Sequence, residues 1–269
     1  MCLILIACGA HPDFPLVIAG NRDEYYMRPT ARAAFWQDHP HILAGRDLEC
    51  MGTWLGVTRA GSLAALTNFR DPRERKTDAP SRGHLVSDFL LSKLDPRAYL
   101  DEIAAAAARY NGFNLLAGDV DGVFYTSSRD PRVRKLPQGI HGLSNHLLNT
   151  PWPKVVHGKQ RLQQLLARGP DAESLLDLLQ DREPASAREL PDTGIGAEME
   201  RVLSPALIVS PQYGTRASTA LLFGADGSVS FTERTILPGG GTGPTVSLRF
   251  KLQAHRERAA SKRGECLPP

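Results

Sequence analysis

Short apolar runs separated by turn residues recur along the chain and predict its strands. Residues 3–7 and 16–19 are apolar at nearly every position and are joined by a His-Pro-Asp turn, which indicates a hairpin buried on both faces. The same pattern predicts three further hairpins, formed by residues 53–57 with 62–67, 113–117 with 123–126, and 217–223 with 229–233. Residues 136–143 add one more strand-like stretch around a glycine.

Segments with apolar residues at helical spacing are fewer. The expected helices cover residues 85–94 (capped by Ser81), 98–110, 152–166 (ended by Gly169) and the residues that follow Asp171. Strands thus come as consecutive hairpins and helices come in pairs, which favours antiparallel sheets with helices packed outside them over alternating βαβ units. Residues 183–201 are polar and contain Pro and Gly, so they predict a mobile surface segment.

Composition narrows the class of protein. The chain has 269 residues, of which 42% are hydrophobic and 23% are charged, and no linker divides it, so we expect a single domain over residues 1–269. Residues 255–269 are expected to form a flexible basic tail. The net charge of +3, from 32 basic and 29 acidic residues, does not indicate a nucleic-acid partner.

Cysteine usage and hydropathy predict the compartment. Four cysteines without CxxC spacing are too few for a disulfide framework in a chain of this length, which fits a reducing compartment. No stretch approaches the ~20 apolar residues that a membrane span needs. We therefore expect no transmembrane segment and a cytoplasmic location.

The second residue is a candidate nucleophile. Removal of Met1 would place a thiol and a free α-amine together on Cys2, which is the N-terminal version of a nucleophile with its own general base. The α-amine has an ordinary pKa of about 7.7–8.0 and the thiol one of about 8.5, so both change protonation near neutral pH. The alternative is that Cys2 is simply a buried strand residue, because free cysteine is among the most buried residue types.

Polar side chains follow several of the predicted strands. Asn21-Arg22-Asp23-Glu24 comes after the second apolar run, and Asn68, Asn145 and Arg216 lie next to later ones. Asparagine donates hydrogen bonds to a developing oxyanion, arginine anchors carboxylates, and an aspartate holds an α-amine. Taken one at a time, each is as readily a turn, cap or salt-bridge residue.

These motifs together carry a resemblance to a known family. Met1-Cys2 and Asn21-Arg22-Asp23-Glu24 are followed in order by Gly52-Thr53-Trp54-Leu55-Gly56, Leu66-Thr67-Asn68, Asn111-Gly112-Phe113-Asn114, Leu143-Ser144-Asn145, Tyr213-Gly214-Thr215-Arg216 and Phe231-Thr232-Glu233-Arg234. From residue 2 to about 234 the chain resembles the NRDE family, also called the transport and Golgi organisation protein 2 family. The resemblance implies an α+β fold of the N-terminal-nucleophile hydrolase type, an αββα four-layer sandwich with two antiparallel sheets between helix layers.

A looser resemblance, to the choloylglycine hydrolase and acid ceramidase branch of that fold, implies roles for single residues. Cys2 matches the nucleophile of these amide-cleaving enzymes, and Arg22 and Asp23 match their Arg and Asp, although the branch usually separates the two. The remaining counterparts are Asn68, Asn145 and Arg216.

Two functions follow from these resemblances. The first is an N-terminal-cysteine hydrolase acting on a non-peptide amide or acyl bond of a small or lipid-like molecule. The second is a non-catalytic protein that binds or carries haem or an acyl-lipid in the same pocket.

No cofactor is expected for catalysis, and haem enters only as a transported ligand. His39 and His41 have no third ligand at metal spacing, so no catalytic metal is expected. The glycine-rich residues 239–243 lack the Lys and the helix of a phosphate loop and are interpreted as a flexible connection.

Overall fold

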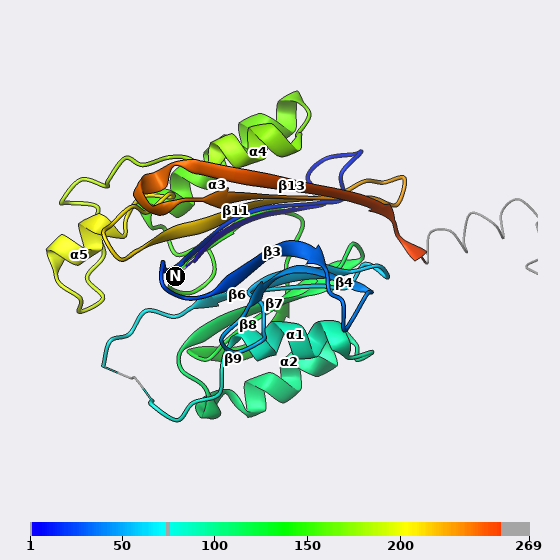
Figure 1. The fold of residues 1–269 in the computed structure, drawn as a ribbon, viewed down its shortest axis with the longest axis horizontal. Helices are drawn as coiled ribbons and strands as arrows, with labels where there is room; N and C mark the ends of the chain where they lie inside the picture. Colours follow the sequence, from blue (N-terminus) through cyan, green and yellow to red (C-terminus); the bar gives the residue numbers. More distant parts are fainter. Residues whose placement is uncertain (1, 74–75, 254–269) are drawn as a thin grey trace, which may run out of the picture.

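Two antiparallel sheets lie face to face at the centre of the part of the protein described here, residues 2–73 and 76–253 of a computed structural model (Figure 1). The six-stranded sheet has the order β10 (Gly139–Leu143), β1 (Cys2–Cys8), β2 (Leu16–Tyr25), β11 (Tyr213–Phe223), β12 (Ser228–Ile236) and β13 (Thr242–Lys251). The seven-stranded sheet runs in chain order through β3 (Thr30–Phe35), β4 (Ile42–Asp47), β5 (Leu55–Thr58), β6 (Leu63–Asn68), β7 (Phe113–Asp119), β8 (Gly122–Ser127) and β9 (Asp130–Lys135).

Helices cover the outer face of each sheet. α3 (Pro153–Arg168) and α4 (Ala172–Leu178) pack on β10, β1 and β11, whereas α1 (Gly83–Leu91) and α2 (Pro96–Ala105) pack on β5 to β9 (Figure 1). The short α5 (Ala197–Val202) precedes β11, and two 3₁₀ turns, η1 (Ala107–Arg109) and η2 (Pro238–Gly240), complete the described elements. The predicted αββα four-layer sandwich is therefore confirmed.

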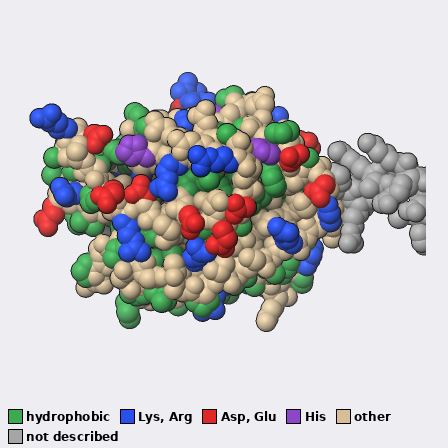
Figure 2. All heavy atoms as spheres, turned by 90° about the horizontal axis from the view of Figure 1, so that it is seen from above, with side chains coloured by type: hydrophobic (Ala, Val, Ile, Leu, Met, Phe, Trp, Pro, Cys, Tyr) green, Lys and Arg blue, Asp and Glu red, His purple; other side chains and the backbone are tan. Residues whose placement is uncertain are grey.

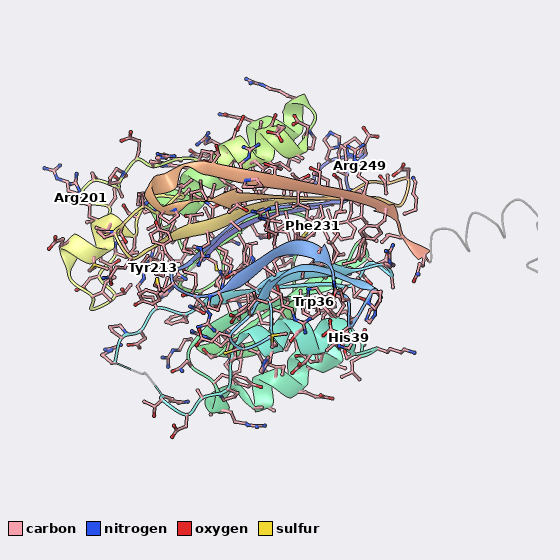
Figure 3. The ribbon with its side chains drawn as sticks, in the orientation of Figure 1. Trp36, His39, Arg201, Tyr213, Phe231 and Arg249 are labelled. Atoms are coloured by element: carbon pink, nitrogen blue, oxygen red, sulfur yellow. The ribbon has the colours of Figure 1, made fainter. Side chains whose placement is uncertain are left out.

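The alternation of side chains along β1 explains why that strand is apolar throughout. Ile4 and Ile6 point into the core between the two sheets, while Leu3 and Leu5 point outward into the core under α3 and α4. A further core lies between the seven-stranded sheet and α1 with α2. Figure 3 shows Phe231 between the sheets and Trp36 on the side of α1 and α2.

The predicted hairpins are present as β1–β2, β5–β6, β7–β8 and β11–β12, and the strand-like stretch around Gly139 contains β10. The four expected helices are also present. β2 continues to Tyr25, so the Asn21–Glu24 run lies inside this strand and not beyond its end. Its four side chains therefore point alternately to the two faces of the sheet.

Four strands were not predicted, namely β3, β4, β9 and β13. β9 and β13 are edge strands whose exposed positions carry polar or charged residues, so the apolar signal is weak. Residues 239–243, interpreted as a flexible connection, instead contain the end of η2 and the start of β13. The prediction that Ser81 caps the first helix is also wrong, because Arg82 occupies the N-cap position of α1.

The segment 183–201 differs from its prediction as a mobile surface segment. It contains the first turns of α5, and Glu200 within it is buried. The expected flexible tail, residues 255–269, lies outside the described residues. No helix in the described part of the chain is long and apolar enough to cross a membrane. The face seen in Figure 2 carries basic and acidic side chains interspersed with one another, so its charge is mixed.

Candidate active site

Cys2 opens an interior strand of the six-stranded sheet and is held from both sides. In the antiparallel pairing of β1 with β2, Cys2 lies opposite Arg22. On the other side, just beyond the end of β10, the Ser144 hydroxyl donates a hydrogen bond of 3.2 Å to the carbonyl oxygen of Cys2. Two neighbouring segments therefore fix the backbone of the candidate nucleophile.

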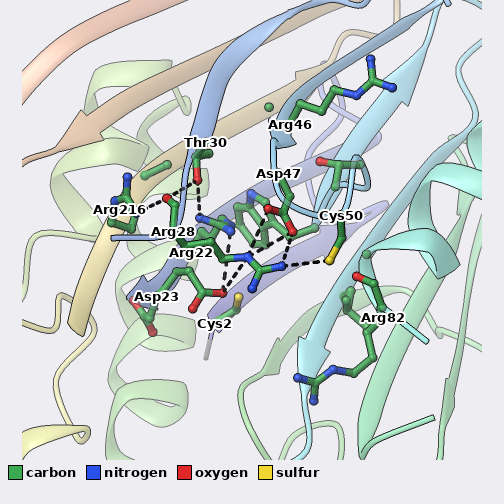
Figure 4. A pocket seen from close by; sticks show the side chains of 18 of the residues that line it. Cys2, Arg22, Asp23, Arg28, Thr30, Arg46, Asp47, Cys50, Arg82 and Arg216 are labelled. Atoms are coloured by element: carbon green, nitrogen blue, oxygen red, sulfur yellow. Dashed lines mark hydrogen bonds and ion pairs between the residues drawn. The ribbon is translucent and has the colours of Figure 1, made fainter. Parts of the chain in front are cut away.

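The side chain of Cys2 lies on the wall of a cavity of about 470 Å³ between the ends of the two sheets (Figure 4). β2 and β11 supply one side of this cavity. The N-terminal end of α1, the strand pair β3–β4 and the end of β6 supply the other. Five of the six predicted site residues line it: Cys2, Arg22, Asp23, Asn68 and Arg216.

Arg22 lies directly beside the thiol. Because paired residues of neighbouring strands point to the same face, Arg22 and Cys2 both face the space between the sheets. The Arg22 guanidinium donates to the Thr30 hydroxyl at 3.3 Å and lies 3.7 Å from a carboxylate oxygen of Glu24. A cation is thus fixed next to the sulfur by its own contacts.

Asp23 lies one residue further along β2 and is only 1% exposed. Its Oδ1 accepts a hydrogen bond of 2.7 Å from the Thr215 hydroxyl, and its carbonyl oxygen accepts one of 3.0 Å from the Tyr213 hydroxyl. Burial raises the pKa of the Asp23 carboxyl, although Lys154 and the Thr215 hydrogen bond act in the opposite direction. Asp23 is therefore a buried acid whose ionised form depends on neighbouring cations.

Burial also raises the pKa of the Cys2 thiol, although Arg22 lowers it to a smaller extent. The resting thiol is therefore protonated at neutral pH. Because the thiolate is the nucleophilic form of cysteine, this site needs a base that removes the proton during the reaction.

The two predicted asparagines occupy different positions. Asn68 ends β6 in the seven-stranded sheet and lines the cavity across from β1. Asn145 is fully buried outside the cavity lining, and its Nδ2 donates to the carbonyl oxygen of Asn68 at 3.0 Å. Asn145 therefore supports the backbone from which Asn68 projects.

Arg216 lies at a bulge of β11, where the register with β2 shifts between Thr215 and Ala217. Its guanidinium donates to the carbonyl oxygens of Tyr25 and Arg28, at 2.8 and 3.0 Å. It therefore ties the turn after β2 to β11 while lining the cavity.

Several charged residues near the site were not identified from the sequence. In the cavity, Arg28 binds Asp47 through two nitrogens, with a shortest distance of 2.6 Å, and Arg82 projects from the N-cap of α1. Behind the strand ends, Lys154 is 5% exposed, and its ammonium donates to the carbonyl oxygen of Leu203 at 2.8 Å.

Lys154 and the ion pair of Arg70 with Glu200 form a buried charged group near Asp23. Burial lowers the pKa of Lys154 to about 8, while the charge of Asp23 raises it. A sequence signal for Lys154 did exist. Lys154 lies four residues before Gly158 and eight before Leu162, which places it on the buried face of α3, where a charged side chain is unusual.

The described residues contain no group of three or more His, Cys, Asp or Glu side chains arranged to hold a metal ion. Three described cysteines, Cys2, Cys8 and Cys50, are free thiols. Cys50 also lines the cavity, with its sulfur 3.4 Å from a guanidinium nitrogen of Arg28. The arrangement can therefore present a thiol, a buried carboxylate and several guanidinium groups to one bound molecule.

Sequence comparison finds relatives over nearly the whole chain. Residues 1–238 match the family described as transport and Golgi organisation 2. The transport and Golgi organization protein 2 homolog of cattle is 38% identical over 97% of this chain and 100% of its own length. The fruit-fly transport and Golgi organization protein 2 is 26% identical over 88% of this chain and 92% of its own.

Solved structures give more distant matches. A conjugated bile acid hydrolase from Clostridium perfringens matches with a TM-score of 0.48 and 9% identity, over 92% of each chain. An N-acylethanolamine-hydrolyzing acid amidase orthologue from Caenorhabditis elegans matches with a TM-score of 0.41 and 11% identity, over 82% of this chain and 92% of that one.

Proposed function

The chain belongs to the transport and Golgi organisation 2 family, and we propose that it is a hydrolase whose nucleophile is the thiol of Cys2. Removal of Met1 gives this residue the free α-amine that acts as its base. The bond cleaved is a non-peptide amide or acyl bond of a small or lipid-like molecule. The observation that carries the proposal is the position of Cys2 on the cavity wall, with Arg22 on the same face and Asp23 buried one residue away.

The α-amine supplies the base that the buried, protonated thiol of Cys2 needs. As the sulfur attacks the carbonyl carbon, its proton passes to the α-amine, and the carbonyl oxygen becomes an oxyanion. The α-ammonium then protonates the leaving nitrogen as the carbon–nitrogen bond breaks, which leaves a thioester on Cys2. Water hydrolyses the thioester, releases the acid and restores the thiol.

The surrounding residues have distinct parts in this scheme. Asp23 holds the α-ammonium, and the Thr215 hydroxyl orients its carboxylate. Asn68, which lines the cavity opposite β1, donates to the oxyanion. Arg22 stabilises negative charge on the sulfur and on the oxyanion, because its guanidinium faces the same space as the thiol.

A mass-spectrometric assay tests this function. The wild type and Cys2→Ser protein are incubated with p-nitrophenyl octanoate, and the intact masses and the acylated peptide are measured. We expect loss of Met1 and one octanoyl group on Cys2, with no acylation of Cys2→Ser. Cys50→Ser is the matched control, because Cys50 lines the same cavity, and it should be acylated like the wild type.

Two outcomes contradict the proposal. Quantitative Met1 on protein that still acylates normally at Cys2 rules out the α-amine as base. Labelling at Cys50 in place of Cys2 rules out the nucleophile and leaves a non-catalytic carrier of haem or acyl-lipid as the better function.

A further inference from the structure

The cavity beside Cys2 is lined by more arginines than its proposed chemistry requires. Six arginines face it, Arg22, Arg28, Arg32, Arg46, Arg82 and Arg216, against four acidic residues, Asp23, Glu24, Asp47 and Glu233. Arginine is the side chain best suited to bind carboxylate and phosphate, because its planar fork of donors matches their geometry. An arginine of the lining that has no carboxylate partner is available to bind an anionic ligand.

Three of the six lie within 4.0 Å of a carboxylate. Arg22 and Arg28 flank Glu24 at 3.7 and 4.0 Å, and Arg28 also binds Asp47. Arg46 binds both carboxylate oxygens of Asp38 at 2.7 Å. These ion pairs also occupy two of the four acidic residues of the lining.

The other two acidic residues are already engaged by hydrogen-bond donors. Oε1 of Glu233 accepts a hydrogen bond of 2.7 Å from the Ala33 backbone, and burial raises the pKa of this carboxyl. Asp23 is buried, and the Thr215 hydroxyl already donates to it. The lining therefore keeps an excess of positive charge.

Arg82 is the arginine best placed to use that excess. No carboxylate of the described residues lies within 4.0 Å of it. One of its nitrogens donates to the carbonyl oxygen of Gly112 at 2.9 Å, which fixes the side chain and leaves its other donors for a ligand. Arg82 is partly exposed, and its burial lowers the pKa of the guanidinium, while negative charge on Glu24 or Cys2 raises it.

Figure 4 shows Arg82 and Arg216 on opposite sides of Cys2. They come from different layers of the fold, since Arg82 precedes α1 and Arg216 lies on β11. Arg216 is likewise without a carboxylate within 4.0 Å in the described part of the chain, but it already holds two carbonyl oxygens. A partly buried cation without a carboxylate partner is less well solvated than a surface one, and a bound anion would compensate its charge.

We infer that Arg82 anchors an oxyanion of the substrate, a carboxylate or a phosphate, while the acyl carbon lies at Cys2. This inference rests on the proposed function for the position of the acyl group. It narrows the substrate class to acyl compounds that carry a second, negatively charged group, and it makes Arg82 a specificity-determining residue.

A matched pair of acyl probes tests the inference. p-Nitrophenyl hydrogen suberate carries a free carboxylate at its far end, and p-nitrophenyl methyl suberate is the same molecule with that charge removed. Homologues from succinate to sebacate vary the distance between the acyl carbon and the carboxylate. We expect the wild type to be acylated about tenfold faster by the best charged probe than by its methyl ester.

Variants of Arg82 should remove that preference selectively. Arg82→Gln should abolish the advantage of the charged probe, so that the two probes acylate this variant at rates within about twofold of each other. Arg82→Lys keeps the charge and should retain part of the preference. Arg97→Gln is the matched control, because Arg97 is exposed on α2 away from the cavity and its loss changes the net charge equally.

Equal rates for both probes in the wild type overturn the inference and leave the proposed function intact. If no probe acylates Cys2, the proposed function fails, and binding decides the inference separately. Calorimetry then compares suberanilic acid, its methyl ester and inorganic phosphate on Cys2→Ala protein with and without Arg82→Gln. Anion binding that Arg82→Gln weakens about tenfold supports the anchor, and anion binding that is absent or unchanged overturns it.

Discussion

Thr215 donates a hydrogen bond of 2.7 Å to the carboxylate of Asp23, across the pairing of β11 with β2. The same hydroxyl accepts a hydrogen bond from the backbone nitrogen of Ile208 at 2.9 Å. Thr215 is thus fixed by a second contact, and its hydroxyl hydrogen is directed to Asp23. Thr215 therefore fixes the orientation of a carboxylate that lies one residue from Arg22, in the strand beside Cys2.

Asp23→Asn should separate the chemistry of this site from its stability. Without the carboxylate the α-amine of Cys2 loses its partner, so acylation by p-nitrophenyl octanoate should slow by about 100-fold or more. Mass spectrometry with time-resolved sampling measures this rate, and Thr215→Val should give a smaller loss in the same direction.

Asp23→Asn should slow acylation without lowering the free energy of unfolding. Because burial raises the pKa of Asp23, the folded state binds a proton more tightly than the unfolded state, and this residue's contribution to stability falls as pH rises above its unfolded value. At pH 7 Asp23→Asn should therefore be at least as stable as wild type in urea unfolding. Wild-type acylation by this variant would contradict the assigned role.

An N-terminal insertion should block activity without touching the cavity. A glutamate inserted between Met1 and Cys2 prevents Met1 removal and turns the α-amine of Cys2 into an amide, which is no longer a base. We expect acylation to fall by about 100-fold or more, with an unchanged circular dichroism spectrum and melting temperature. An inserted protein that acylates at the wild-type rate would show that another base serves the thiol.

The strand pair that carries the nucleophile could be predicted from the sequence, because both strands are buried on both faces and are therefore apolar throughout. The sequence marks Asn68 and Arg216 as polar residues next to predicted strands, but only the family resemblance predicts that they belong to the same site as Cys2. Nothing in their local sequence indicates that β6 and β11, from different sheets, open on one cavity. Arg82 was missed because an arginine before a helix is ordinary on a surface.

The buried charges were missed for a different reason. Glu200 lies in a polar stretch with Pro and Gly, where local composition indicates a solvated segment. Its burial depends on Arg70, which is 130 residues away in the chain and is itself stacked over the ring of Trp152. Long-range ion pairs of this kind leave no periodic signal, so local sequence patterns cannot find them.

Lys154→Met should change how stability depends on pH. The pKa of Lys154 is about 8 in the folded protein and about 10.5 when unfolded, so between these values the unfolded state binds the extra proton. The unfolding free energy of wild type should therefore rise by about 3 kcal/mol relative to Lys154→Met as pH goes from 7 to 10.5. Urea unfolding of both proteins across this range measures the difference, and a constant difference would mean that Lys154 titrates normally.

Glu200→Ala should destabilise the protein strongly even though its segment lies on a polar stretch of the sequence. Removing one member of a buried ion pair leaves the charge of the Arg70 guanidinium less compensated, which costs about 3–5 kcal/mol. Glu200→Gln keeps one acceptor oxygen, for either Arg70 or Thr193, and should lose less. Glu198→Ala is the control, because Glu198 is exposed on the same helix and its loss should change the unfolding free energy by less than about 0.5 kcal/mol.

The comparison also tests whether this ion pair is linked to the thiol. Arg70 is one of the cations that favour the ionised form of Asp23, and Glu200→Gln removes the negative charge that compensates Arg70, so the pKa of Asp23 should fall. Acylation of Cys2 in Glu200→Gln should therefore follow a pH profile shifted from that of wild type, whereas Glu198→Ala should retain the wild-type profile. Identical pH profiles in all three proteins would mean that the ion pair of Arg70 with Glu200 only holds α5 against the strand ends and does not influence the thiol.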